Sequence, residues 1–148
     1  RVTSTITLRL RPEPRHNRLV TFIGRVKAKD DEILFDEHKT WKVNESCAVR
    51  PEQREDSWEF RGCVGDEVVV KLKITCKLLA DNVTVNVAGR AELHESTGCG
   101  DEREDSEDFL RDLGPAASDQ IKIHLENDPI GGNDTSDITL TIVNGEGI

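Results

Sequence analysis

The side chains with the clearest chemical potential in this sequence are acidic, and they gather in three clusters. Each cluster falls where a loop or a strand end is expected, and binding residues concentrate in such places. Calcium takes about six to eight oxygen ligands from carboxylates, amides and backbone carbonyls on flexible loops. The predicted calcium ligands are Asp30, Asp31, Glu32 and Asp36, then Asp101, Glu102 and Asp105, then Asp128, Asn133, Asp134 and Asp137.

The calcium prediction depends on the acidic loops lying at one end of the fold. Carboxylates brought together there would repel one another by roughly a few kcal/mol unless a cation lay between them. The alternative interpretation is that each cluster is a solvated acidic loop whose charges are screened by salt. The sequence therefore predicts calcium as the cofactor on the condition that the loops converge.

Other metal-binding and catalytic patterns are weaker. His94 and His124 are expected on the outward faces of their strands, and they would suit a surface zinc site if those strands were neighbours. The sequence has no GxSxG, HExxH, P-loop or GxGxxG motif, so it lacks the signatures of several large enzyme classes. An enzyme that uses a pair of carboxylates stays open, because their separation depends on the fold.

The cysteines are even in number and lie on or beside predicted strands, without any CxxC pair. A zinc ribbon is therefore disfavoured, and the choice is between two disulfides and reduced thiols. Of the possible pairings we favour the one in which each bridge closes a local loop next to a strand end. It joins Cys47 to Cys63 and Cys76 to Cys99.

The composition indicates a secreted, extracellular protein. Glycosylation sequons begin at Asn44, Asn82 and Asn133, and the absence of Met fits a mature or excerpted chain. The formal net charge of −9 repels phosphate backbones and anionic membranes, so nucleic acid is not expected as a partner. No apolar run reaches the roughly 20 residues of a membrane span, and the sequence does not indicate an oligomeric state.

A long hairpin is the strongest structural signal. Apolar and polar residues alternate through Val68–Leu78, and the alternation resumes after the turn-forming Ala80–Asn82 and continues to Leu93. Ser106–Leu113 has helical spacing and a Gly-Pro stop, so it is expected to be a short helix. The whole pattern predicts a single domain, 1–148, folded as an antiparallel β-sandwich of about eight strands with one short helix. An up-and-down barrel stays open.

These observations favour an extracellular calcium-binding module with a non-catalytic role in binding or adhesion, for which a protein or a carbohydrate is the expected ligand. One alternative is a small secreted hydrolase, or a hydrolase accessory domain, that uses paired carboxylates. Another is an inhibitor that presents the loop Arg50–Asp56. The basic stripe of Lys71, Lys73 and Lys77 is interpreted as the guard of an edge strand or as a dock for an anionic partner.

Overall fold

The computed structural model describes residues 3–5, 15–31, 35–95, 103–127 and 134–147. It is all β-structure, with eight strands and, among these residues, no helix. The strands are β1 (Arg18–Asp30), β2 (Glu37–Val49), β3 (Glu55–Val64), β4 (Val68–Leu78), β5 (Val85–Glu95), β6 (Arg103–Leu113), β7 (Ser118–Glu126) and β8 (Thr135–Glu146). The predicted antiparallel β-sandwich is confirmed.

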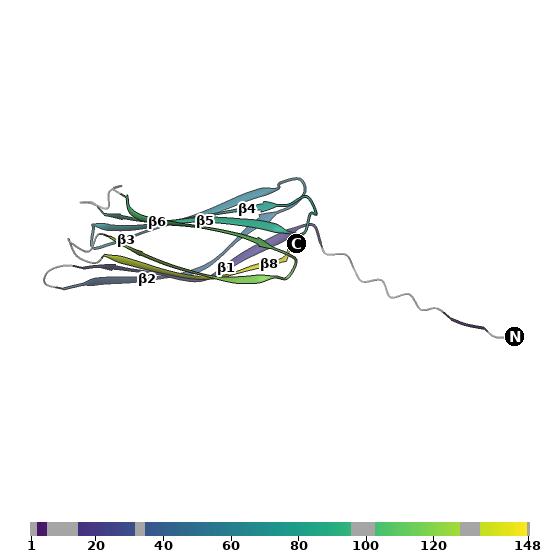
Figure 1. Cartoon of the computed structure of the whole chain (residues 1–148), viewed down its shortest axis with the longest axis horizontal. Helices are drawn as coiled ribbons and strands as arrows, with labels where there is room; N and C mark the ends of the chain where they lie inside the picture. Colours follow the sequence, from purple (N-terminus) through teal and green to yellow (C-terminus); the bar gives the residue numbers. More distant parts are fainter. Residues whose placement is uncertain (1–2, 6–14, 32–34, 96–102, 128–133, 148) are drawn as a thin grey trace.

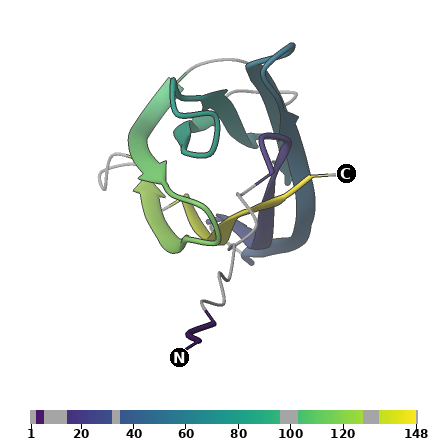
Figure 2. The same cartoon turned by 90° about the vertical axis from the view of Figure 1, so that its right-hand side faces the viewer.

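The strands form two antiparallel sheets of four, in the orders β2-β1-β8-β7 and β3-β4-β5-β6. The two sheets lie face to face (Figure 1), and an end-on view shows them wrapped around a shared interior (Figure 2). The chain runs up and down through neighbouring strands, as in the barrel alternative. The β2/β3 and β6/β7 seams divide it into two sheets.

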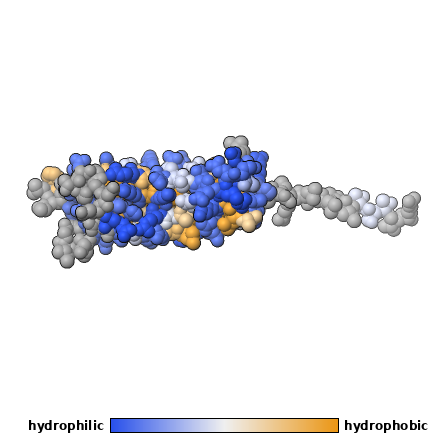
Figure 3. Space-filling model, turned by 90° about the horizontal axis from the view of Figure 1, so that it is seen from above, coloured by the Kyte–Doolittle hydropathy of each residue, from blue (hydrophilic) through white to orange (hydrophobic). Residues whose placement is uncertain are grey.

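The core follows from the alternation in the sequence. In β4 the side chains of Leu72, Ile74 and Cys76 are buried, whereas the neighbouring Lys73 and Lys77 are exposed. The same period of two recurs in the other sheet, and the two inner faces form one apolar cluster. The surface in Figure 3 is mostly hydrophilic, with small apolar patches.

The predicted helix over Ser106–Leu113 is wrong, because this segment belongs to strand β6. Phe109 and Leu113 face the core, while Leu110 is exposed, an alternation that suits a strand as well as a helix. Phe109 lies opposite Gly89, and a Cβ on that glycine would come within 2.0 Å of the ring. Because Gly89 has no side chain, the ring of Phe109 can pack directly over β5.

The predicted turn between β4 and β5 is confirmed. Asn82 has a φ of 61°, in the left-handed region that Asn tolerates. The carboxylate of Asp81 accepts hydrogen bonds from the backbone N–H groups of Val83 (3.0 Å) and Thr84 (2.8 Å). These bonds hold the pKa of Asp81 below its usual range, the bond from the Thr84 hydroxyl being the largest cause.

The favoured disulfide pairing is wrong. Cys47 and Cys76 are free, buried thiols in the structure. Cys47 lies near the end of β2, at Val20 of β1, whereas Cys63 lies near the far end of β3, so the two do not close the loop between their strands. Cys63 is not among the free thiols, and Cys99 lies outside the described residues.

The alternating strand directions give the sandwich two distinct ends. The β1–β2, β3–β4, β5–β6 and β7–β8 connections leave at one end, which we call the acidic end. The β2–β3, β4–β5 and β6–β7 connections lie at the other end with the C-terminus, and we call it the closed end (Figure 1). Within the described residues, no helix is long and apolar enough to cross a membrane.

Candidate functional site

The three acidic clusters predicted from the sequence belong to connections at the acidic end. The clusters lie at the β1–β2, β5–β6 and β7–β8 connections, which the up-and-down topology sends to the same side. The described strand ends from which these loops leave therefore lie at one end of the sandwich.

Asp134 is the centre of the described part of this end, and its side chain is almost wholly buried, at 3% exposure. Its Oδ1 accepts a hydrogen bond from the backbone N–H of Asp31 (2.8 Å), and its Oδ2 accepts one from the Asn127 amide (3.1 Å). The backbone N–H of Asp134 donates in return to Oδ1 of Asn127 (3.0 Å). These bonds join the β1–β2 connection to the base of the β7–β8 connection.

Glu95, at the end of β5, brings a second carboxyl group to Asp134. The Asn127 amide, which binds Asp134, also donates to Oε2 of Glu95 at 2.7 Å. Burial raises the pKa of Glu95, and the carboxyl group of Asp134 raises it further by charge repulsion and by a hydrogen bond between the two groups, while Asn127 lowers it. The pair therefore favours a shared proton or a nearby cation over two bare negative charges.

The other described candidates for calcium ligands have partners of their own. Asp30 is buried beside Gly65, where a Cβ on the glycine would lie 2.0 Å from Oδ2. Asp36 pairs with Lys29 at 3.4 Å. Asp105 accepts hydrogen bonds from the backbone N–H groups of Ser106 (2.9 Å) and Glu126 (3.1 Å), so it ties β6 to β7.

Asp137 is exposed on β8, where its Oδ1 lies 2.6 Å from Nδ1 of His124. The remaining candidates lie outside the described residues; they are Glu32, Asp101, Glu102, Asp128 and Asn133. Among the residues that are described, no group of three or more His, Cys, Asp or Glu side chains is arranged to hold a metal ion.

The predicted surface zinc site is wrong, because its histidines lie in different sheets. His94 is on β5 and His124 is on β7, and these strands do not pair. A register shift between Leu93 and His94 turns both side chains away from solvent, so His94 is 5% exposed. Its Nε2 lies 3.1 Å from Glu92.

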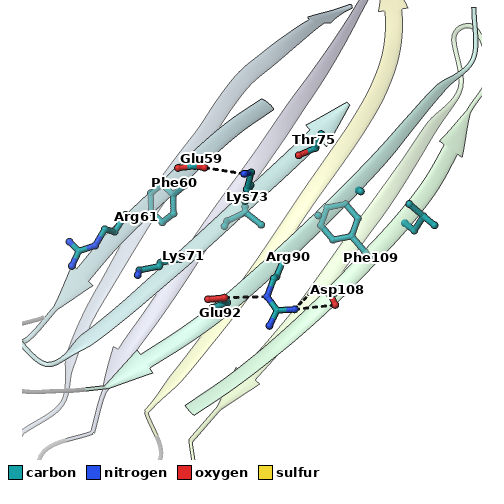
Figure 4. A pocket seen from close by; sticks show the side chains of 14 residues that line it. Glu59, Phe60, Arg61, Lys71, Lys73, Thr75, Arg90, Glu92, Asp108 and Phe109 are labelled. Carbon is teal, nitrogen blue, oxygen red and sulfur yellow. Dashed lines mark hydrogen bonds and ion pairs between the residues drawn. The ribbon is translucent and has the colours of Figure 1, made fainter. Parts of the chain in front are cut away.

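A second candidate site is a groove of about 990 Å³ on the outer face of the β3-β4-β5-β6 sheet (Figure 4). Charged side chains line most of the groove, and its apolar contact comes from Ala88 and from Leu110, which is 63% exposed. The side chains that reach this face come from all four strands of the sheet; they are Glu59, Arg61, Lys71, Lys73, Thr75, Ala88, Arg90, Glu92, Asp108 and Leu110.

The charges in the groove alternate in sign across the strands. Lys73 lies 3.5 Å from Glu59, and Arg90 lies 3.2 Å from both Glu92 and Asp108. The hydrogen bond to Glu92 and the charge of Asp108 raise the pKa of Arg90, which stays fully charged. The groove is a polar surface that offers donors and acceptors side by side.

The groove also changes the interpretation of the lysine stripe. β4, which carries Lys71, Lys73 and Lys77, pairs with β3 on one side and β5 on the other, so the edge-strand interpretation is wrong. Lys77 lies 3.9 Å from Glu55, and Lys73 faces Glu59. The lysines balance acidic residues of the neighbouring strand.

Sequence reasoning missed Glu95 and Asn127 as members of the acidic end. Glu95 lies just beyond the predicted alternation, which ends at Leu93, and nothing around it in the sequence indicates a partner. Asn127 stands beside Asp128 in an oxygen-rich stretch, which was the one signal available. The contact among Glu95, Asn127 and Asp134 joins parts of the chain that are 32 and 7 residues apart, so no local spacing announces it.

Comparisons of the chain with protein-family models, with curated proteins and with solved structures found no match.

Proposed function

We propose that this chain is an extracellular calcium-binding β-sandwich module with a non-catalytic binding role. The observation that supports the proposal best is the contact between the carboxyl groups of Glu95 and Asp134 at the end where the acidic loops leave the sheets. Two carboxyl groups in contact repel each other when both are ionised. At neutral pH a calcium ion beside them removes that repulsion.

The ligand set would combine this pair with oxygen atoms from the acidic loops predicted from the sequence. Calcium accepts carboxylate, amide and backbone oxygens together, and Asn127 and Asp134 already bring such groups to the base of the β7–β8 connection. Calcium and the proton on Glu95 would compete for the same carboxyl group. We therefore expect calcium affinity to rise with pH.

The experiment is thermal unfolding at pH 7.5 in calcium and in EDTA. Free calcium at about 100 times its Kd stabilises a one-site protein by about 2.7 kcal/mol, a rise of several degrees in Tm. Asp134→Asn should abolish the rise. Asp56→Asn is a matched control, because Asp56 also accepts a backbone hydrogen bond, from Ala48 at 2.9 Å, but lies toward the closed end.

Two outcomes would reject this part of the proposal. An unchanged Tm of the wild-type protein in millimolar calcium means that the acidic end holds no calcium. A calcium-dependent rise that survives Asp134→Asn places the ion elsewhere. Isothermal titration with calcium on the same proteins reports the number of ions directly.

For the binding role we propose the groove on the outer sheet face as the ligand surface. Its alternating arginine, lysine and carboxylate side chains offer the paired donors and acceptors that a carbohydrate or a polar protein surface requires. A glycan array and a pull-down with extracellular protein extracts test these ligands. Arg90→Gln should abolish binding, and Lys122→Gln on the opposite sheet should not.

The hydrolase alternative has one observation in its favour. The raised pKa of Glu95 beside the carboxyl group of Asp134 resembles the division of roles in a pair of catalytic carboxylates. Turnover of a glycoside or peptide substrate that is lost in Glu95→Gln would support this function over calcium binding. Calcium-dependent stability without turnover would support the module.

A further inference from the structure

Two cysteines face each other across the interior of the sandwich. Cys47 is on the inner face of β2, in one sheet, and Cys76 is on the inner face of β4, in the other. Both are free thiols with 0% exposure. A hydrogen bond joins the two side chains, with Cys76 as the donor, so the thiols are neighbours across the interior.

The pair lies beside the β2/β3 seam, where the two sheets are not joined by a strand ladder. A hydrogen bond of 2.9 Å from the Ala48 N–H to Oδ2 of Asp56 bridges this seam next to Cys47. Asp56 is also the register partner of Cys76 on β4. Asp56 therefore links the backbone next to Cys47 to the strand position opposite Cys76.

We propose that Cys47 and Cys76 form a disulfide that staples the two sheets when the folding chain meets a low-molecular-weight disulfide such as oxidised glutathione. The Cys47 thiolate attacks one sulfur of the reagent, forms a mixed disulfide and expels one glutathione thiolate. The Cys76 thiolate then attacks the Cys47 sulfur and expels the second. Two protein thiols are oxidised, one glutathione disulfide is reduced to two thiols, and the protons pass to them.

The hydrogen bond assigns the order of attack. Because Cys76 donates to Cys47, the pKa of Cys47 is lowered and that of Cys76 is raised. The thiolate is the nucleophile in exchange reactions, so Cys47 reacts first. In the folded chain both sulfur atoms are buried, so this order applies when a reagent enters as the β2/β3 seam opens. Before the sheets close during folding the hydrogen bond is absent, and either cysteine can react first.

The test is refolding of the full chain in a glutathione redox buffer and, in parallel, in excess dithiothreitol. Free thiols are then alkylated, the protein is digested without reduction, and linked peptides are identified by mass spectrometry. We expect a peptide that joins Cys47 to Cys76 after oxidative refolding, and both residues alkylated after refolding in dithiothreitol. The oxidised protein should unfold roughly 10 °C higher, because the bridge constrains the unfolded chain.

The variants Cys47→Ala and Cys76→Ala separate this bridge from any bond made by the other cysteines. Each variant should lose the linked peptide. Each should also show a smaller difference in Tm between the oxidised and the reduced protein than the wild type shows. If a variant does not fold, the peptide map of the wild-type protein still shows whether Cys47 and Cys76 are linked. Alkylated Cys47 and Cys76 after oxidative refolding, or linkage of either to Cys63 or Cys99, would overturn the proposal.

Discussion

The two ends of the sandwich bury polar groups in opposite ways. At the closed end, Asn144 is fully buried and donates to the carbonyl groups of Val83 (2.9 Å) and Leu113 (2.8 Å). Its Oδ1 accepts from Nε of Arg18 at 2.9 Å. At the acidic end, Asn127 has the same residue type but donates to two carboxyl groups, those of Glu95 and Asp134.

The Asn144 and Asn127 networks differ in whether they contain carboxyl groups, which can titrate. The Asn144 network joins one buried guanidinium to neutral oxygen atoms. Desolvation lowers the pKa of Arg18 and the charge of Glu146 raises it, and an arginine side chain keeps its charge in proteins. The Asn127 network holds two carboxyl groups whose joint charge changes with a proton or a cation. The closed end is therefore built for constant stability, and the stability of the acidic end depends on the solution.

The largest expected effect is at the closed end. Asn144→Ala leaves buried carbonyl groups and one guanidinium N–H without their partners, and it should destabilise the protein by about 3 kcal/mol at every pH. Urea unfolding measures this loss. Asn86→Ala is the control, because Asn86 bonds to the exposed Asp112 at 2.7 Å, and its loss should cost less than about 1 kcal/mol. Equal losses would contradict the comparison.

A smaller loss is expected from Asp134→Ala at the acidic end. The substitution leaves the backbone N–H of Asp31 without its acceptor and removes one partner of Asn127, which should cost about 2 kcal/mol in urea unfolding without calcium. Asp134→Asn retains an acceptor oxygen, so it should cost less. If Asp134→Asn costs as much as Asp134→Ala, the negative charge, and not the hydrogen bond to Asp31, holds this end together.

The strands could be predicted from the sequence because they follow from the alternation of neighbouring apolar and polar residues. In β4 and β5 the inward residues are apolar or glycine and most of the outward ones are polar, and Asp81 and Asn82 mark the turn between the strands. Ser106–Leu113 was misassigned because Phe109 and Leu113 have a spacing that fits a helix and a strand alike. Its partner Gly89 decides between them, and that contact is not local.

The position of the acidic clusters along the chain could be predicted for the same reason, whereas their spatial partners could not. Acidic loops are visible in the sequence, and the alternation of strands sends them to one end. The partners of Asp134 come from β5 and from the ends of β1 and β7, which approach only in the folded sheets. The pairing of cysteines failed likewise, because Cys47 and Cys76 meet across two sheets and not across a local loop.

Glu95→Gln tests the titration of the acidic end. The pKa of Glu95 is raised in the folded protein, so its stabilising contribution is complete below the ordinary pKa of the carboxyl group and is lost as pH rises through the folded value. In EDTA, wild-type stability should therefore fall as pH rises across that range. Glu95→Gln, which carries no titratable proton, should flatten this fall. An unchanged slope would show that Glu95 does not share the proton.

The smallest effect is expected at the surface of the acidic end, where His124 lies between Asp137 (2.6 Å from Nδ1) and Glu126 (3.5 Å from Nε2). The hydrogen bond to Asp137 is the main cause that raises the pKa of His124. The pair therefore stabilises the fold fully below the ordinary histidine pKa and loses that contribution as pH rises through the folded value. These side chains are more than half exposed, so solvent screening keeps the change below about 0.5 kcal/mol. A histidine titration by NMR should show the raised pKa return toward normal in Asp137→Asn, with almost no change in urea midpoint. A large change in stability would mean that Asp137 supports the acidic end through more than this exposed pair.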